Sequence, residues 1–171
     1  MAQEFQKDLL EIRRTFFEPC GFRSTEPLAE PESAEYSACD FKLNNHSVKF
    51  RIAKITPTKI GQFVTLWKRI GAGPIQPFET SDKIDFFLVC VRSPKNFGVF
   101  VFPMSALQKH DIVSHNKVGG RRALRVYPPW DVAVNAQAKK TQKWQLEFFL
   151  DLSDLDAVDL ARGKELISVR R

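Results

Sequence analysis

Two almost wholly apolar segments, residues 84–91 and 97–102, constrain the fold more than any other feature of this sequence. The first is followed by Ser93–Pro94 and the second by Pro103, so each has the length of one strand. Strands that read as continuous apolar runs are covered on both faces, as in the middle of a sheet. We therefore expect a sheet with these two strands near its centre and other elements packed on both sides.

A β-hairpin is expected before these strands, around Asn44–Asn45, a pair that suits a tight turn. In its first strand the alternating pattern places three apolar residues on one face: Cys39, Phe41 and Leu43. In its second strand, one face carries Val48, Phe50, Ile52 and Lys54. Lys54 is therefore predicted to stand at the end of an apolar row.

Helical spacing or helix-start signals predict helices at residues 3–17, 56–69, 104–109 and 132–143. Residues 18–34 are predicted to be a connecting loop. The alternating residues 144–150 favour a strand, with a helix as the alternative. A chain of 171 residues with 43% hydrophobic content suits one domain, residues 1–171. The fold class that follows is α/β, a mixed sheet flanked by helices.

The charge distribution points to an anionic partner. From residue 41 to residue 78 there are seven bases and no acid, and from 117 to 150 there are seven bases and two acids. Repulsion among these positive charges destabilises the compact state unless a bound anion offsets it. This favours nucleic acid as the partner. The alternative is a solvated basic face balanced by acidic segments elsewhere.

Membrane insertion and secretion are not expected. The longest apolar run is the six residues Phe86–Val91, too short to span a bilayer, and the N-terminal residues are charged. Cys20, Cys39 and Cys90 have no CxxC spacing, which favours reduced thiols and a cytoplasmic location.

The first candidate anion site is the predicted helix start after Lys54. Thr56 would be the N-cap and Pro57 the first helical residue, and the first turn carries Lys59 and no acid. A helix N-terminus with free N–H groups binds phosphate or carboxylate. The predicted anion-binding residues are Lys54, Thr56, Thr58 and Lys59. In the alternative, both lysines extend into solvent.

The second candidate anion site is the basic region GGRRALRVYPPWD together with the following AKKTQKWQ. Three arginines and two aromatic residues alternate there, as in proteins that bind single strands. They are Arg121, Arg122, Arg125, Tyr127 and Trp130. The aromatic residues could equally cover the core.

A third candidate site pairs Asp40 with Lys54. A carboxylate that holds Mg²⁺ and a lysine that stabilises charge on a phosphate are the parts of a phosphodiesterase. The alternative is a plain cross-strand ion pair.

Several segments resemble the MepB-like proteins, and together they cover roughly residues 35–150. They are YSACDFKL, FRIAKITPTKIGQFVTLWKR, PFETSDKIDFFLVCVR, FGVFVFP, RVYPPWD and KTQKWQLEFFL. The order of elements also resembles the restriction-endonuclease-like core of the PD-(D/E)-x-K nucleases.

This second resemblance implies a set of site residues. Asp40 takes the place of the metal-binding Asp, Lys54 that of the Lys, and Ile52 the place of the second carboxylate. Because an Ile cannot bind a metal, a displaced ligand would have to come from Glu35 or Gln62. The resemblance thus implies Mg²⁺ as cofactor only if the site is catalytic.

We therefore expect a nucleic-acid-binding protein of nuclease-like fold. One alternative is an Mg²⁺-dependent phosphodiesterase with a displaced carboxylate, and the other is a module that binds a small anion or a protein.

Overall fold

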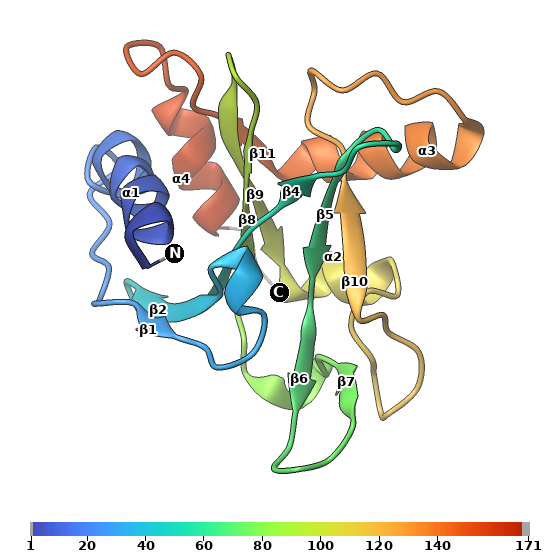
Figure 1. Cartoon of the computed structure of the whole chain (residues 1–171). Coiled ribbons are helices and arrows are strands. Elements are labelled where there is room, and N and C mark those ends of the chain that lie inside the picture. Colours follow the sequence, from blue (N-terminus) through green and yellow to red (C-terminus); the bar gives the residue numbers. More distant parts are fainter. Residues whose placement is uncertain (1, 169–171) are drawn as a thin grey trace.

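The computed structural model describes the backbone of residues 2–168 and the side chains of residues 7–168, and its centre is a six-stranded sheet (Figure 1). The strands lie in the order β1-β2-β3-β8-β9-β11. Their bounds are β1 Leu28–Ala29, β2 Cys39–Leu43, β3 His46–Ile52, β8 Phe86–Arg92, β9 Phe97–Pro103 and β11 Phe149–Asp151. Neighbours β3 and β8 are parallel, and the other four pairs are antiparallel. The predicted α/β class with a mixed sheet is confirmed.

Strands β8 and β9 occupy the interior, as their apolar sequences predict. Every side chain from Phe86 to Val91 and from Phe97 to Pro103 is buried. The predicted hairpin is also present as β2 and β3, with Leu43 opposite His46. Asn44 has a φ of 53°, the left-handed conformation that a two-residue turn requires.

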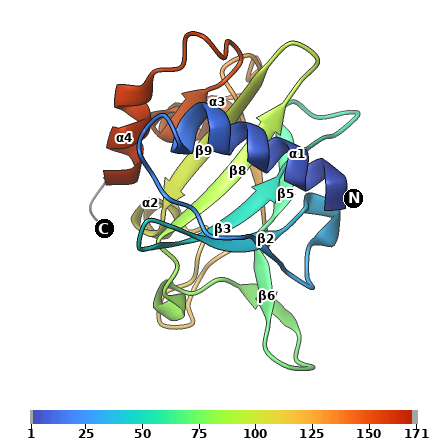
Figure 2. The same ribbon diagram turned by 90° about the vertical axis from the view of Figure 1, so that its left-hand side faces the viewer.

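Two helical segments cover one face of the large sheet (Figure 2). Helix α1 (Ala2–Ile12) continues as a π-helix (Arg13–Phe17), and α4 (Leu160–Ser168) follows near the end of the chain. The buried face of the first helical segment is Leu9, Ile12, Phe16 and Phe17. The helix predicted at residues 3–17 is thus confirmed, except that the predicted contact of Phe5 lies outside the described side chains. Helix α4 was not predicted.

The opposite face packs against helix α2 (Met104–Lys109) and a second sheet in the order β10-β5-β4. Its strands are β10 Ala123–Val126, β5 Gln62–Thr65 and β4 Lys54–Ile55. A two-stranded ribbon, β6 (Trp67–Arg69) with β7 (Ile75–Pro77), extends from it. Residues 2–168 also contain three short 3₁₀ helices: Ala34–Tyr36, Thr80–Asp82 and Leu146–Phe148.

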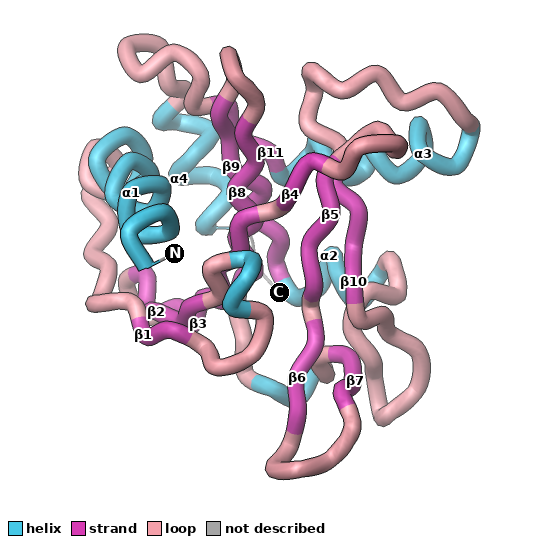
Figure 3. Tube along the Cα trace, in the orientation of Figure 1, coloured by secondary structure: helices cyan, strands magenta, loops and turns pink. Residues whose placement is uncertain are grey.

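The helix predicted from Thr56 onward is wrong, because this segment forms bends and strands (Figure 3). Gly61 has a φ of +88°, and a Cβ there would lie 2.8 Å from the ring of Tyr127. After it, Val64 is buried while Phe63 and Thr65 are half-buried, which is the alternation of a strand. Aromatic and β-branched residues favour strands, and pairing with β10, far away in the sequence, fixes this conformation.

The boundaries near the C-terminus also differ from the prediction. Helix α3 spans Ala136–Gln145, and it begins there because the side chain of Asn135 accepts a hydrogen bond from the backbone N–H of Ala138. Of the predicted strand at 144–150, only the end is extended, in β11. Within residues 2–168, no helix has the length and apolar character needed to cross a membrane.

Candidate functional site

The structure separates the two residues predicted to form a catalytic pair. Asp40 lies on β2 opposite Lys49, whereas Lys54 lies on β4 in the other sheet, opposite Phe63. Ile52 packs into the core beneath α1, on the face of β3 opposite to Lys49. The assignment of Lys54 and Ile52 to nuclease positions beside Asp40 is therefore wrong, because β3 ends at Ile52 and the chain changes sheets.

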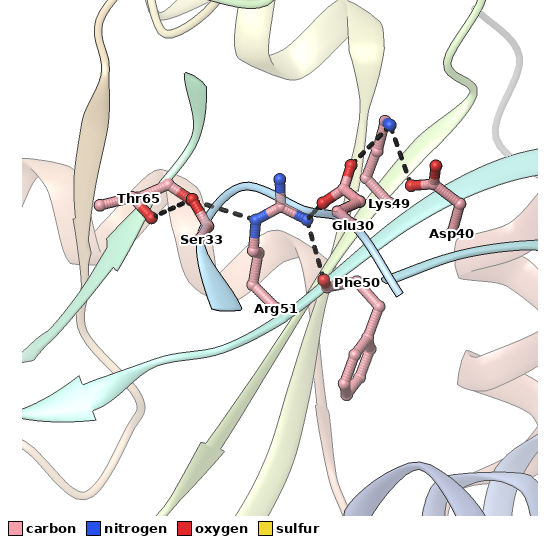
Figure 4. A network of polar contacts seen from close by, with 7 residues as sticks. All are labelled: Glu30, Ser33, Asp40, Lys49, Phe50, Arg51 and Thr65. Atoms are coloured by element: carbon pink, nitrogen blue, oxygen red, sulfur yellow. Dashed lines mark hydrogen bonds and ion pairs between the residues drawn. The ribbon is translucent and has the colours of Figure 1, made fainter. Parts of the chain in front are cut away.

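The residue that does pair with Asp40 is Lys49, which also binds Glu30 (Figure 4). Lys49 Nζ donates to Glu30 Oε1 at 2.6 Å and lies 2.9 Å from Asp40 Oδ1. The other carboxylate oxygen of Glu30 pairs with the guanidinium of Arg51. We call these four residues (Glu30, Asp40, Lys49 and Arg51) the charged network.

Arg51 is the buried end of the charged network. Its side chain is 1% exposed, against 11% for Glu30 and 43% for Asp40. The guanidinium donates to the backbone carbonyls of Phe50 at 3.0 Å and Thr65 at 3.3 Å. Because Thr65 belongs to β5, Arg51 ties the large sheet to the three-stranded sheet.

Burial and the neighbouring charges have opposite effects on the pKa values of Glu30, Lys49 and Arg51. Burial raises the pKa of Glu30, although Arg51 and Lys49 both act to lower it. Burial lowers the pKa of Arg51 against the opposing effect of Glu30. At Lys49 burial acts to lower the pKa, but hydrogen bonds to Glu30 and Asp40 outweigh it and the pKa is raised. The ammonium of Lys49 is thus stabilised between two carboxylates.

The charged network does not fit Mg²⁺. A carboxylate site for Mg²⁺ directs oxygens at the position of the metal. Here the oxygens of Glu30 and Asp40 converge on Lys49 Nζ, and Arg51 pairs with the remaining oxygen of Glu30. Two side-chain cations therefore occupy the positions that a metal would take.

The predicted replacement ligands lie elsewhere. Glu35 is exposed on the 3₁₀ helix Ala34–Tyr36, and its charge contributes to a raised pKa of Tyr36, which is caused mainly by burial. Gln62 is buried and donates to the carbonyl oxygen of Arg92 at 3.1 Å. Among the side chains of residues 7–168, no group of three or more His, Cys, Asp or Glu is arranged to hold a metal.

Two of the predicted anion-binding residues are brought together on the three-stranded sheet. On the central strand β5, Phe63 lies directly opposite Lys54 on one side and Arg125 on the other. The guanidinium of Arg125 lies 5.8 Å from the ring of Phe63, and Lys54 Nζ lies 5.1 Å from the ring of Tyr36. The rings of Tyr36 and Phe63 are 6.2 Å apart. We call these four residues (Tyr36, Lys54, Phe63 and Arg125) the cation–aromatic face.

Thr56 adjoins this face, although it caps no helix. Arg125 donates to the hydroxyl of Thr56 at 3.0 Å, so the two basic stretches of the sequence meet at this contact. Thr58 and Lys59 are exposed in the bend that follows. The anion site at a helix N-terminus is wrong in its geometry, but Lys54 and Thr56 remain beside other basic residues.

The residues of the second predicted basic segment lie in different surroundings. Arg121 and Arg125 line one pocket together with Tyr127, whereas Arg122 is exposed outside it. Trp130 packs edge-on against Phe149 at 5.8 Å, so it covers the core, the alternative expected for the aromatic residues.

Sequence reasoning missed Glu30, Lys49 and Arg51. A two-residue turn at Asn44–Asn45 fixes the register of the hairpin, and that register already places Lys49 opposite Asp40 and Arg51 on the same face. Glu30 carries no such signal, because its position depends on the two-residue strand β1 within a predicted loop.

The chain is similar to MepB-like proteins in both sequence and structure. A family model described as MepB-like matches residues 30–151. The crystal structure of MepB is similar, with 32% sequence identity, a TM-score of 0.73, and coverage of 77% of this chain and 88% of that chain. A bacterial homing endonuclease, I-Ssp6803I, is 16% identical, with a TM-score of 0.44 and coverage of 79% of this chain and 83% of that one. No curated protein matches the sequence.

Proposed function

This chain belongs to the MepB-like family, and we propose that it binds nucleic acid through the cation–aromatic face without cleaving it by Mg²⁺ chemistry. The observation that carries the proposal is the position of Phe63 between Lys54 and Arg125, on neighbouring strands of one small sheet. Binding and catalysis are separate parts of the proposal, and each has its own support.

Binding is supported by the chemistry of the cation–aromatic face. Proteins that hold single strands combine cations that follow the phosphates with aromatic rings on which bases stack. Lys54 is exposed, while Phe63 and Arg125 are half-buried, so cations and a ring are accessible together. The neighbouring bend adds the exposed side chains of Thr58 and Lys59.

Absence of Mg²⁺-dependent cleavage is inferred from the charged network. A metal bound between Glu30 and Asp40, at the oxygens that face Lys49, would have to displace the ammonium of Lys49 from both carboxylates. That displacement would leave a half-buried ammonium without its two carboxylate partners, which opposes metal binding. The network is therefore interpreted as structural.

The experiment is a binding titration of labelled single-stranded DNA, single-stranded RNA and duplex DNA by fluorescence anisotropy at two salt concentrations. With about four to six phosphates neutralised, the logarithm of affinity should fall against the logarithm of salt with a slope of roughly −3 to −5. If none of the three ligands binds at low salt, nucleic-acid binding is refuted.

Point variants test whether the cation–aromatic face is the surface that binds nucleic acid. Lys54→Ala should weaken binding by about 1 kcal/mol, or about fivefold, and Lys59→Ala by a similar amount, because each removes one charge-assisted contact. The control is Lys42→Ala, which removes a lysine of β2 in the other sheet. Thermal melting of each variant checks that the fold is intact. Equal loss of binding in Lys42→Ala and Lys54→Ala would refute the cation–aromatic face as the site.

A further inference from the structure

A pocket of about 350 Å³ lies between strand β10 and helix α3. Strand β10 and the residues around it supply Arg121, Arg125 and Tyr127 to the lining, and α3 supplies Lys140, Thr141 and Trp144. His110 closes the pocket from the end of α2. We call it the basic pocket. Arg125 belongs both to this pocket and to the cation–aromatic face.

The lining of the basic pocket is positive and contains no carboxylate. Within residues 7–168, Arg121, Arg125 and Lys140 form no ion pair, whereas Lys49, Lys68 and Arg92 all do. Burial, and then the positive charges of Lys109 and Lys140, lower the pKa of His110, with Glu147 opposing them. The positive charge in the pocket is therefore not neutralised by the described residues.

Two stacked rings, those of His110 and Trp144, also line the pocket, and we call them the aromatic wall. The rings of His110 and Trp144 are stacked at 3.9 Å with an interplanar angle of 6°. The ring of Trp144 packs against the ring of Phe102, and the two ring centroids are 5.5 Å apart. Tyr127 lines the same pocket, so aromatic surface and cations are present together.

We infer that the basic pocket binds one nucleoside monophosphate unit, with the phosphate at Arg121, Arg125 and Lys140 and the base against the aromatic wall. A guanidinium recognises a phosphate by paired hydrogen bonds, and a base stacks on an aromatic ring. A pocket of this size accepts a single unit, in contrast to the strand surface formed by β4, β5 and β10. Such a unit is either a free nucleotide or the phosphorylated end of a strand that lies on the cation–aromatic face.

The end-of-strand form of this inference rests on the proposed function, whereas the free-nucleotide form does not. Because Arg125 lines the pocket and also belongs to the cation–aromatic face, a strand could cross that face and end in the pocket. The end of a strand then adds phosphate contacts that an interior unit does not make.

The test measures the affinity of the full chain for three probes: AMP, a short labelled oligonucleotide with a 5′-phosphate, and the same oligonucleotide with a 5′-hydroxyl. The variants are Arg121→Ala and Lys140→Ala. Their matched controls are Arg122→Ala and Lys139→Ala, the exposed sequence neighbours of Arg121 and Lys140, which do not line the pocket. All four changes are at exposed positions, so none is expected to unfold the protein.

The phosphorylated oligonucleotide should bind about fivefold more tightly than the hydroxyl form, the same scale of one charge-assisted phosphate contact. Arg121→Ala and Lys140→Ala should abolish that difference, and the two controls should retain it. If AMP binds and both oligonucleotides bind equally, the pocket takes the free nucleotide. If AMP does not bind and the oligonucleotides bind equally in every variant, the pocket inference is overturned while the proposed function stands. If neither oligonucleotide binds but AMP does, the proposed function fails and the pocket stands.

Discussion

Replacement of Arg51 by Met is the sharpest probe of the charged network. The side chain of Arg51 is 1% exposed and pairs with Glu30, which is 11% exposed. Removing one partner of a buried pair leaves the other charge poorly compensated, which typically costs about 3–5 kcal/mol. For a chain of this size each kcal/mol lowers the melting temperature by about 2–4 °C, so Arg51→Met should melt roughly 6–20 °C below the parent.

The stability that Arg51→Met loses should depend on pH, because it depends on the protonation of Glu30. Burial raises the pKa of Glu30 in the folded protein, and Arg51 acts to lower it. Without Arg51 this pKa moves further above its value in the unfolded chain. A carboxyl with a raised pKa favours folding while protonated and loses that contribution as pH rises through the folded pKa. The deficit of Arg51→Met should therefore be larger near about pH 8 than near about pH 5.

Urea denaturation of parent and variant, followed by tryptophan fluorescence at both pH values, measures this effect. The double variant Glu30→Gln/Arg51→Met should recover part of the loss, because it removes the stranded carboxylate as well. Arg69→Met is the matched control. It breaks the ion pair with Glu32, in which both side chains are 36% exposed, and should cost less than about 1 kcal/mol. If Arg51→Met unfolds like the parent, or loses equal stability at both pH values, the account of the network is wrong.

Three further predictions follow from burial and charge. Millimolar Mg²⁺ should leave the melting temperature unchanged and should produce no cleavage of plasmid DNA or RNA, because Lys49 occupies the carboxylate site; a stabilisation that saturates with Mg²⁺ would contradict this. Cys39 and Cys90 should resist a thiol reagent at mildly alkaline pH until urea is added, because burial raises the pKa of both thiols, that of Cys39 to about 12. Gly98→Ala should destabilise the protein by about 1–3 kcal/mol in a urea melt, since a Cβ there would collide with the ring of Phe149.

The large sheet could be predicted because its signals are local. The apolar runs of β8 and β9 and the tight turn at Asn44–Asn45 each lie within a few residues, and each gave the correct element. Strand β5 could not be predicted in the same way. Its flanking Thr56 and Pro57 are good helix-start residues, and the pairing with β10 that makes it a strand joins residues about sixty positions apart.

The candidate site likewise has features that local sequence signals indicate and features that depend on long-range pairing. The register of the hairpin, available from the turn, indicates that Lys49 and Arg51 share a face with Asp40. The assignment to Lys54 failed because it extended the strand beyond Ile52, where the chain leaves the sheet. The contact between Phe63 and Arg125, and the pocket beside it, depend on long-range pairing and could be found only in the folded chain.

Hydrogen exchange of the protein with and without a single-stranded oligonucleotide tests the central claim most directly, because it reports which backbone amides the ligand protects. The cation–aromatic face and the basic pocket predict slower exchange in β4, β5 and β10 and in the adjoining bend at Thr56. Residues around Asp40 and Lys49, which border a separate pocket of about 290 Å³, should exchange as before. Protection confined to that second pocket, with β4, β5 and β10 unchanged, would contradict the account.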